Sequence, residues 1–436
     1  MVLCRVNGFL RECILSQGME QNLIFELAGT CSLTAQRTGR HLVISESWNR
    51  DRIVFESIDL LRLRSMTVYG KWKSFLIPQC AKLLRVLDLE DALGVTDGDV
   101  EQMVKLLPRL KFLSLRGCHE IFHLPSALGD LRQLQTLDVA NTSIITLPAS
   151  ITKLQKLQYI RGGTTTTATQ DPSAPHASSR LSKFLRRRRP LVGVEAPSRI
   201  GKLTALHTLG VVNIGASRWK AILKELKNLT QLRKLGVFGV NRKNSEAFFS
   251  TISSHVHLGS LSMWLDEGSR GCLDDISLPL ENLQSLKLYG LLDRLPVLQV
   301  NQLSKLTKLH LEMTRLMDEA IEFLGKLPKL CILRLCVEYG QLDFHVFEEP
   351  SYQKVKVLDI ACRSSLHVTF GSEAMEKIEQ LTFDCYSESS YQFSGLDHLS
   401  ELKEVWLKGA YEEALKEQLQ GQLADHPREP VLKLEE

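Results

Sequence analysis

The chain has 436 residues, of which 44% are hydrophobic and 24% are charged, so it can bury a large core. A single hydrophobic core rarely grows to this length, which predicts several domains or an array of repeats. The net charge of +4 is too small to indicate a specific nucleic-acid partner. No apolar run is long enough to cross a bilayer, so we expect no membrane span.

The first segment, residues 1–40, is expected to contain no repeat. Phe9 to Leu15 are expected to form a short helix, followed by an irregular stretch. The segment also lacks the apolar core and the cleavage site of a signal peptide. The ten cysteines of the chain include no CxxC pair, which argues against zinc binding and favours reduced, mostly buried thiols in a cytosolic protein.

A leucine pattern, L-x-x-L-x-L, recurs through residues 41–160 and again through residues 198–410. Full copies, with Val or Ile at some Leu positions, begin at Leu84, Leu110, Leu134, Leu206, Leu232, Leu258, Leu283, Leu306, Leu330, Val355, Ile378 and Leu402. A degenerate copy begins at Leu63 and a half copy at Leu157. With one exception, after Leu157, the steps between copies lie within the roughly 20–29 residues of a leucine-rich repeat.

This periodicity predicts the fold class. Leucines at alternate positions point to one side of a short strand, and each coil of the chain pairs its strand in parallel with the strand before it. The Leu124-Pro125 and Leu147-Pro148 steps interrupt regular helix on the other side of the coil. We therefore expect an α/β leucine-rich-repeat solenoid, a horseshoe with a parallel β-sheet on its concave face and short helices, 3₁₀ turns and loops on its convex face.

The period breaks at residues 161–197, which are rich in Thr, Pro and Arg and have few residues that could fill a core. We interpret this segment as a flexible insertion. Its run Arg186 to Arg189 is either a nuclear-localisation or phosphate-binding patch or an incidental charge in a solvated loop. At the other end, Leu415, Leu419 and Leu423 have helical spacing, so residues 411–436 are expected to be a capping helix and tail.

No catalytic signature occurs in the sequence. Gly201-Lys202 resembles the end of a phosphate loop, but Leu203 stands where Ser or Thr is required. The close histidine pairs, His119 with His123 and His255 with His257, have no partner at metal-ligand spacing. We therefore expect no enzymatic activity, no cofactor and no metal.

The residues between and after the strand leucines are expected to face outward on the concave sheet. Three consecutive repeats place Phe238, Trp264 and Tyr289 after the last strand leucine, which predicts an aromatic ladder. The position between the leucines holds Lys287, His310 and Arg334 in consecutive repeats, and Trp406 further along. Aromatic and basic side chains side by side are typical of protein-binding hot spots and suit an acidic partner surface. The alternative is that each aromatic only packs on its neighbours.

Three stretches resemble one protein family. They are Ile58 to Gly70, Leu83 to Glu90 (LLRVLDLE), and Leu110 to Leu137 (LKFLSLRGCHEIFHLPSALGDLRQLQTL). They look like the repeat region of plant intracellular immune receptors, the nucleotide-binding leucine-rich-repeat disease-resistance proteins, and of the cereal coiled-coil type in particular. Residues 1–40 then resemble the winged-helix end of the family's nucleotide-binding module. Asn7 and Gly8 stand where the family has the His and Asp of its Met-His-Asp motif.

This resemblance implies a role in the defense response. The chain is expected to recognise pathogen effectors or guarded host proteins, and to restrain a nucleotide-binding switch module in cis or in trans. The family's coiled coil and most of its nucleotide-binding module are missing, so the chain resembles a truncated product or a partial gene model. A cytoplasmic location, with the nucleus as a second option, follows from the family. The alternatives are a leucine-rich signalling scaffold or a ubiquitin-ligase adaptor, although residues 1–40 are too short for an F-box module.

Overall fold

The computed structural model describes residues 24–29, 39–49, 51–77, 79–163, 193–269, 271–274, 281–338, 340–344, 351–362, 365–372, 374–385, 391–409 and 411–435. The chain divides into two compact units, Met1–Leu232 and Arg233–Glu436. Each unit contains its own run of stacked coils, and each coil contributes one strand to a parallel sheet.

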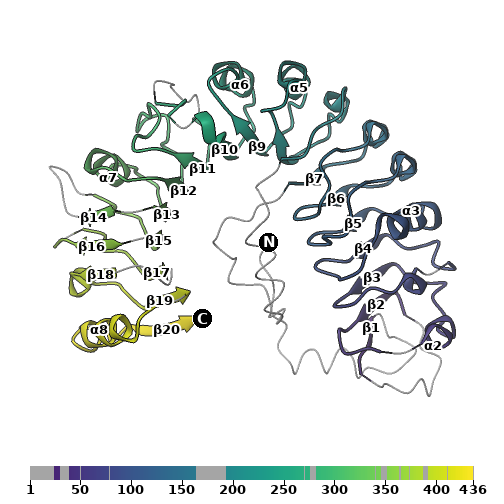
Figure 1. Ribbon diagram of the computed structural model, residues 1–436, viewed down its shortest axis with the longest axis horizontal. Helices are drawn as coiled ribbons and strands as arrows, with labels where there is room; N and C mark the ends of the chain where they lie inside the picture. The colour runs from purple at the N-terminus through teal and green to yellow at the C-terminus, as the bar shows by residue number, and fades with distance from the viewer. Residues whose placement is uncertain are drawn as a thin grey trace. The chain divides into compact units, whose positions relative to one another are not determined.

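The first unit has a sheet in which every strand pairs in parallel with the next along the chain. Its strands are β1 (Ile24–Leu27), β2 (His41–Ile44), β3 (Ser65–Val68), β4 (Val86–Asp88), β5 (Phe112–Ser114), β6 (Thr136–Asp138), β7 (Tyr159–Arg161) and β8 (Thr208–Asn213). The opposite side carries helices α2 (Arg52–Glu56), α3 (Asp97–Leu106) and α5 (Trp219–Leu226), with 3₁₀ turns η1 (Ser74–Leu76), η2 (Ser126–Asp130), η3 (Ala149–Lys153) and η4 (Ile200–Lys202) (Figure 1).

The helical side of this unit follows local capping rules. Thr96 accepts a hydrogen bond from the backbone N–H of Asp99 and the Asp99 carboxylate accepts one from the backbone N–H of Thr96, a capping box that begins α3. Pro125 and Pro148 have extended backbone immediately before η2 and η3, as the Leu-Pro steps predict. Short 3₁₀ turns therefore replace regular helix in these two coils, which confirms the predicted convex side.

The N-terminal prediction needs a correction, because the repeat begins before residue 41. Strand β1 pairs with β2, placing Phe25 opposite Leu42 and Leu27 opposite Ile44, and all four side chains are buried. The leucine motif did not predict these two strands, because Phe and Ile occupy some of their inward positions in place of Leu. Their sequences show only the alternation of apolar and polar residues that is typical of a strand. The predicted helix from Phe9 to Leu15 lies outside the described residues.

The 161–197 insertion has described residues at both ends. Gly162 accepts a hydrogen bond from the backbone N–H of Val211, and the N–H of Val194 donates to the carbonyl of the same Val211. Val194 is buried, so residues from 193 onward belong to the core of the first unit rather than to a solvated loop. The run Arg186 to Arg189 lies outside the described residues.

The second unit has a longer parallel sheet. Its strands are β9 (Lys234–Val240), β10 (Ser260–Leu265), β11 (Ser285–Leu291), β12 (Lys308–Met313), β13 (Ile332–Val337), β15 (Val357–Cys362), β17 (Gln380–Cys385), β19 (Glu404–Gly409) and β20 (Val431–Glu435). Its helices are α6 (Ser245–Ile252), α7 (Asp318–Gly325) and α8 (Glu413–Ala424), and its 3₁₀ turns are η5 (Glu267–Ser269) and η6 (Leu396–His398). In Figure 1 the labelled helices lie on the side of this unit away from the sheet.

The register of this sheet confirms the predicted solenoid. Leu261 of β10 lies opposite Leu235 of β9 and Leu286 of β11, and all three side chains are at most 1% exposed. A single coil cannot bury such leucines by itself, whereas adjacent coils bury them against one another. The motif therefore forms one continuous apolar core within the unit.

A second, smaller sheet was not predicted. Strands β14 (Gly340–Phe344), β16 (Leu366–Phe370) and β18 (Tyr391–Ser394) pair in parallel on the side away from the main sheet (Figure 1). Phe344 stacks on Phe370 with ring centroids 5.7 Å apart, and both rings are buried. These segments alternate apolar and polar residues, so period-two alternation, rather than the leucine motif, was the signal for them.

The described C-terminal residues close the second unit with a helix and a strand. Leu415, Leu419 and Leu423 of α8 are buried. Strand β20 then pairs with β19, with Leu432 opposite Val405 and Leu434 opposite Leu407. The sequence Leu432-Lys433-Leu434 contains only the last half of the motif, which explains why a plain tail was expected there.

Two further predictions concern the described residues. None of their seven cysteines is in a disulfide bond, and Cys118, Cys272, Cys336, Cys362 and Cys385 are buried, as expected for thiols of the core. Among the same residues, none of the helices combines the length and apolar content needed to cross a bilayer.

Candidate functional site

The seven residues predicted to bind a partner all lie on the main sheet of the second unit. Parallel pairing places Phe238 opposite Trp264, and Trp264 opposite Tyr289, in β9, β10 and β11. The Trp264 and Tyr289 rings are stacked, with centroids 4.5 Å apart and planes 9° from parallel. The Tyr289 ring then contacts the ring of His310 on β12 at 4.8 Å, tilted by 47°. The predicted ladder therefore continues into the basic row through His310.

The ladder is far less exposed than the sequence suggested. Trp264 and Tyr289 are each 5% exposed and His310 is 4% exposed, whereas Phe238 is half-buried. Stacking on neighbouring rings covers the faces of these side chains. The position of a residue in the strand predicts that its side chain points outward, but it does not predict this stacking. The expectation of three solvent-exposed aromatics is therefore wrong for Trp264 and Tyr289.

The basic row is formed as predicted by register. Lys287, His310 and Arg334 are direct partners on β11, β12 and β13. Arg334 forms an ion pair with Asp359 of β15, with Nε 2.6 Å from Oδ2. Asp359 occupies the same motif position as Arg334, one coil later, so the sequence places the two residues on neighbouring strands. Asp359 was nevertheless not predicted to belong to the site.

The environment of His310 has a clear electrostatic consequence. Burial, and then the nearby charges of Lys287 and Arg334, lower the pKa of the imidazole to about 3. The ring is therefore neutral at physiological pH, and the cationic character of the row comes from Lys287 and Arg334, both half-buried. Among the described residues, His310 Nε2 and Trp264 Nε1 are buried without a hydrogen-bond partner.

Trp406 lies on β19, apart from the other six residues. Its indole N–H donates to Glu404 at 3.0 Å, and its ring faces two ammonium groups, Lys433 Nζ at 4.7 Å and Lys408 Nζ at 5.2 Å from the centroid. Lys408 lies in the outward-facing column that follows the last strand leucine, but it was not predicted to belong to the site, and Lys433 was not predicted at all. Lys433 belongs to β20, a strand that was not predicted, so no column reading reached it.

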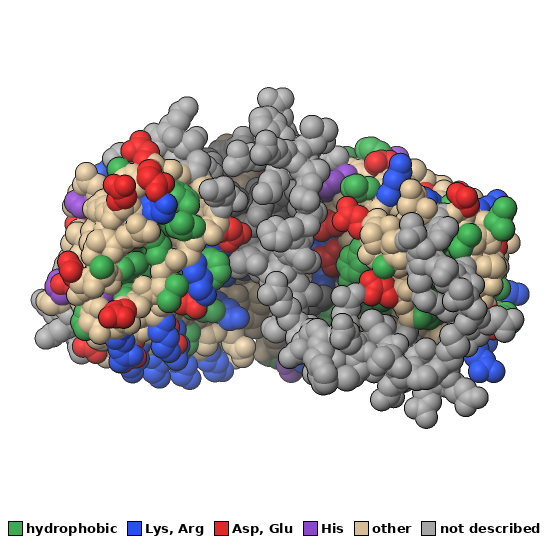
Figure 2. All heavy atoms as spheres, turned by 90° about the horizontal axis from the view of Figure 1, so that it is seen from below, with side chains coloured by type: hydrophobic (Ala, Val, Ile, Leu, Met, Phe, Trp, Pro, Cys, Tyr) green, Lys and Arg blue, Asp and Glu red, His purple; other side chains and the backbone are tan. Residues whose placement is uncertain are grey.

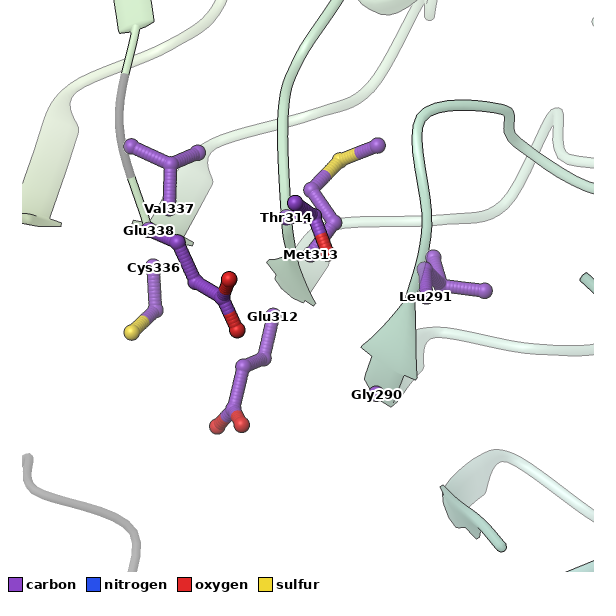
Figure 3. Close-up of a pocket in the computed structure, with 8 residues that line it drawn as sticks. All are labelled: Gly290, Leu291, Glu312, Met313, Thr314, Cys336, Val337 and Glu338. Atoms are coloured by element: carbon purple, nitrogen blue, oxygen red, sulfur yellow. The ribbon is translucent and has the colours of Figure 1, made fainter. Parts of the chain in front are cut away.

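A small pocket lies beside the ladder, at the carboxyl ends of β11, β12 and β13. Figure 3 shows the Glu312 and Glu338 side chains there, with Cys336 nearby. Glu312 is also the strand partner of Tyr289. The enclosed space is about that of one water molecule, so the pocket is not a cofactor cavity. Its lining residues are Gly290, Leu291, Glu312, Met313, Thr314, Cys336, Val337 and Glu338.

Together these contacts define one continuous group of side chains on the sheet of the second unit. A rigid floor of stacked rings is bordered by accessible side chains of Phe238, Lys287 and Arg334. Stacked aromatics lose little conformational entropy on binding, and half-buried cations at their border suit acidic groups of a partner.

Comparison with known proteins identifies the kind of repeat. A family model described as leucine-rich repeat region matches residues 62–432. The rice (Oryza sativa subsp. japonica) disease resistance protein Pik-2 is 30% identical over 346 residues, which cover 75% of this chain and 33% of the relative. The rice disease resistance protein RGA4 is 24% identical over 444 residues, covering 99% of this chain and 41% of the relative.

Among solved structures, the crystal structure of a TDR receptor is similar, with a TM-score of 0.44 and 16% identity, covering 92% of this chain and 62% of that chain. This chain thus spans between a third and a half of the length of the two rice relatives. The family match, the in-register leucine core and the rice relatives agree with one another. The chain belongs to the leucine-rich repeat region family, in the form found in plant disease resistance proteins.

Proposed function

We propose that this chain is the sensor region of a plant immune receptor and that it binds a pathogen effector or a guarded host protein in the cytoplasm. The observation that carries the proposal is the stack of Trp264, Tyr289 and His310, bordered by Phe238, Lys287 and Arg334 on one sheet face. Its partner presents acidic side chains around an apolar or aromatic centre. The similarity to rice disease resistance proteins supports the defense role.

A second element of the proposal is restraint of a switch. Both rice relatives are much longer than this chain, so a sensor region of this kind is joined to further parts in those proteins. We propose that the chain holds a nucleotide-binding module inactive, in cis or in trans, until the partner binds. Binding would then release the module by competing for part of the same repeat surface.

The test is a binding screen followed by substitution of the accessible border. Purified pathogen effectors are screened against the whole chain, and affinity for any hit is then measured for the double variant Phe238→Ala, Arg334→Ala. Hot-spot residues contribute about 2 kcal/mol or more each, so the loss of both should lower the affinity on the order of 1000-fold.

The matched control changes an exposed arginine of the same unit, Arg233→Ala, which lies outside the stack. It should leave affinity within about twofold, as expected for a position away from the hot spot. Unchanged binding by the border variant, with its melting temperature preserved, would place the interface elsewhere on the repeats.

A further inference from the structure

A row of lysines follows the edge of the second unit, away from the aromatic stack. Four consecutive coils place a lysine immediately before the first apolar residue of the leucine motif. We call these residues the lysine ladder: Lys305, Lys329, Lys354 and Lys377. All four are exposed.

The topology places the four lysines along one line. They precede β12, β13, β15 and β17, which are successive neighbours in the parallel sheet. The amino ends of parallel strands meet at one edge, and neighbouring strands are about 4.8 Å apart, so the ladder is a close row of like charges. Lysine and arginine side chains also gather on one rim at the left of Figure 2, the side on which Figure 1 draws the second unit.

The charges of the ladder are not neutralised within the described part of the chain. None of the four lysines forms an ion pair there, and Lys305 donates only to the neutral amide oxygen of Asn282 at 2.8 Å. The carboxylate of Glu379 already pairs with two other lysines, Lys356 at 2.6 Å and Lys403 at 2.7 Å. Like charges on adjacent strands repel one another, so the row destabilises the free protein slightly and favours an anionic ligand.

The composition of the row indicates which kind of anion fits. It contains only lysine, a point charge on a flexible stem, without the planar fork of arginine that reads a defined acidic side chain. Protein interfaces are depleted in lysine and enriched in aromatic residues, and single-stranded nucleic acid needs aromatic rings for base stacking. A row of ammonium groups that contains no aromatic residue suits a surface of many equivalent phosphates.

We propose that the lysine ladder docks reversibly on an anionic phospholipid surface, independently of the protein-binding face. Each lysine near an anionic leaflet strengthens binding roughly fivefold. The four together should therefore strengthen binding on the order of several hundredfold. The contact is electrostatic and peripheral, because the row offers ammonium groups and no apolar side chain to enter the acyl region.

The experiment is sedimentation of the whole chain with vesicles of phosphatidylcholine, with or without phosphatidylserine. The wild-type chain should sediment only with the anionic vesicles, and salt raised from about 0.1 M to about 1 M should release it as the Debye length shortens from about 10 Å to about 3 Å. The variant with all four ladder lysines changed to Gln should lose most of this binding. It should still bind any protein partner of the stack, which separates this inference from the proposed function.

The matched control changes four exposed lysines of the first unit to Gln, with the same change in net charge: Lys202, Lys220, Lys224 and Lys227. It should sediment like the wild type. If the quadruple ladder variant fails to fold, the pairs Lys305→Gln with Lys329→Gln and Lys354→Gln with Lys377→Gln each still predict a loss of roughly 25-fold.

Three results would overturn the inference. In the first, the ladder variant sediments like the wild type. In the second, the control variant loses as much binding, so that net charge rather than position is responsible. In the third, the wild type ignores anionic vesicles but binds poly-uridylate in a ladder-dependent way, which would make the edge a nucleic-acid surface.

Discussion

His310 shows how a single residue on this sheet is controlled by its neighbours. The ring packs on Tyr289 and lies between Lys287 and Arg334, so protonation would add a third positive charge in a desolvated row. The pKa is accordingly lowered from 6.5 to about 3, with burial as the first cause and the two cations after it. The folded structure therefore requires a neutral imidazole at this position, and the stability of the fold depends on pH.

The sign of that linkage follows from the two pKa values. In the unfolded chain the imidazole gains a proton below about pH 6.5, whereas the folded chain resists protonation down to about pH 3. Stability from this residue is therefore complete above pH 6.5 and falls progressively as the pH drops toward 3. Urea unfolding between about pH 7 and pH 5 should show a loss about 2 kcal/mol larger for the wild type than for His310→Gln.

Carboxylates that titrate in the same pH range lower the stability of both proteins equally, so their contribution cancels when the two losses are compared. Equal losses in the wild type and His310→Gln would mean that the ring is hydrated and titrates normally. The same comparison at about pH 8 and pH 7 should show no difference, because both states are then neutral at this position.

At the level of elements, the stacked rings tie three strands together across one sheet face. Trp264, Tyr289 and His310 come from β10, β11 and β12, and each is at least nine-tenths buried. Replacing either large ring leaves a cavity and removes a stacking partner. The aromatic ladder is therefore a structural element of the sheet as well as the floor of the proposed binding surface.

Trp264→Ala should lower the free energy of unfolding by about 3–5 kcal/mol, because a large buried side chain is lost. A double-mutant cycle with Tyr289→Ala should show a coupling of about 0.5–1.5 kcal/mol from the stacked pair. The aromatic control is Phe122→Ala, since Phe122 is 55% exposed, and it should change stability by less than about 0.5 kcal/mol.

The measurement is urea unfolding followed by far-UV circular dichroism. Because both rings support the fold, a double variant Trp264→Ala, Tyr289→Ala that no longer binds a partner could have lost either its contacts or its folded structure. A melting temperature unchanged by the double variant would show that the rings are accessible and that the stack is loose.

At the level of the whole molecule, the leucine period of the first unit is interrupted between β7 and β8. The backbone groups of Gly162 and Val194 both bond to Val211, so the two described ends of the interruption lie on either side of one residue. The chain can therefore be joined across this point by a few residues without moving β7 or β8.

Deletion of residues 165–190 should accordingly leave the fold intact. Loop shortening changes the closure entropy only slowly with length, so the melting temperature should stay within a few degrees of the wild type. Size-exclusion chromatography and circular dichroism check this outcome. A deletion that extends to Val194 is the contrasting variant, and it should lose stability because that side chain is buried. Aggregation of the shorter deletion would assign a structural role to the segment.

The leucine spacing alone was enough to predict the repeat, the parallel sheet and the register of Leu235, Leu261 and Leu286. Each coil can bury its leucines only against the next coil, so local periodicity and global fold carry the same information here. The same columns also identified which residues of the proposed binding surface are strand neighbours. Strands β1, β2 and β20 and the small sheet were missed, because their alternating apolar residues depart from the full leucine motif.

Only the tertiary structure decided what the neighbouring side chains do to one another. The burial of Trp264 and Tyr289, the lowered pKa of His310, the Arg334–Asp359 ion pair and the two lysines on Trp406 all depend on side-chain conformations across strands. A sequence column states which residues are adjacent, but not which rings stack or which charges meet. Those outcomes depend on packing and desolvation, which are properties of three-dimensional surroundings rather than of spacing along the chain.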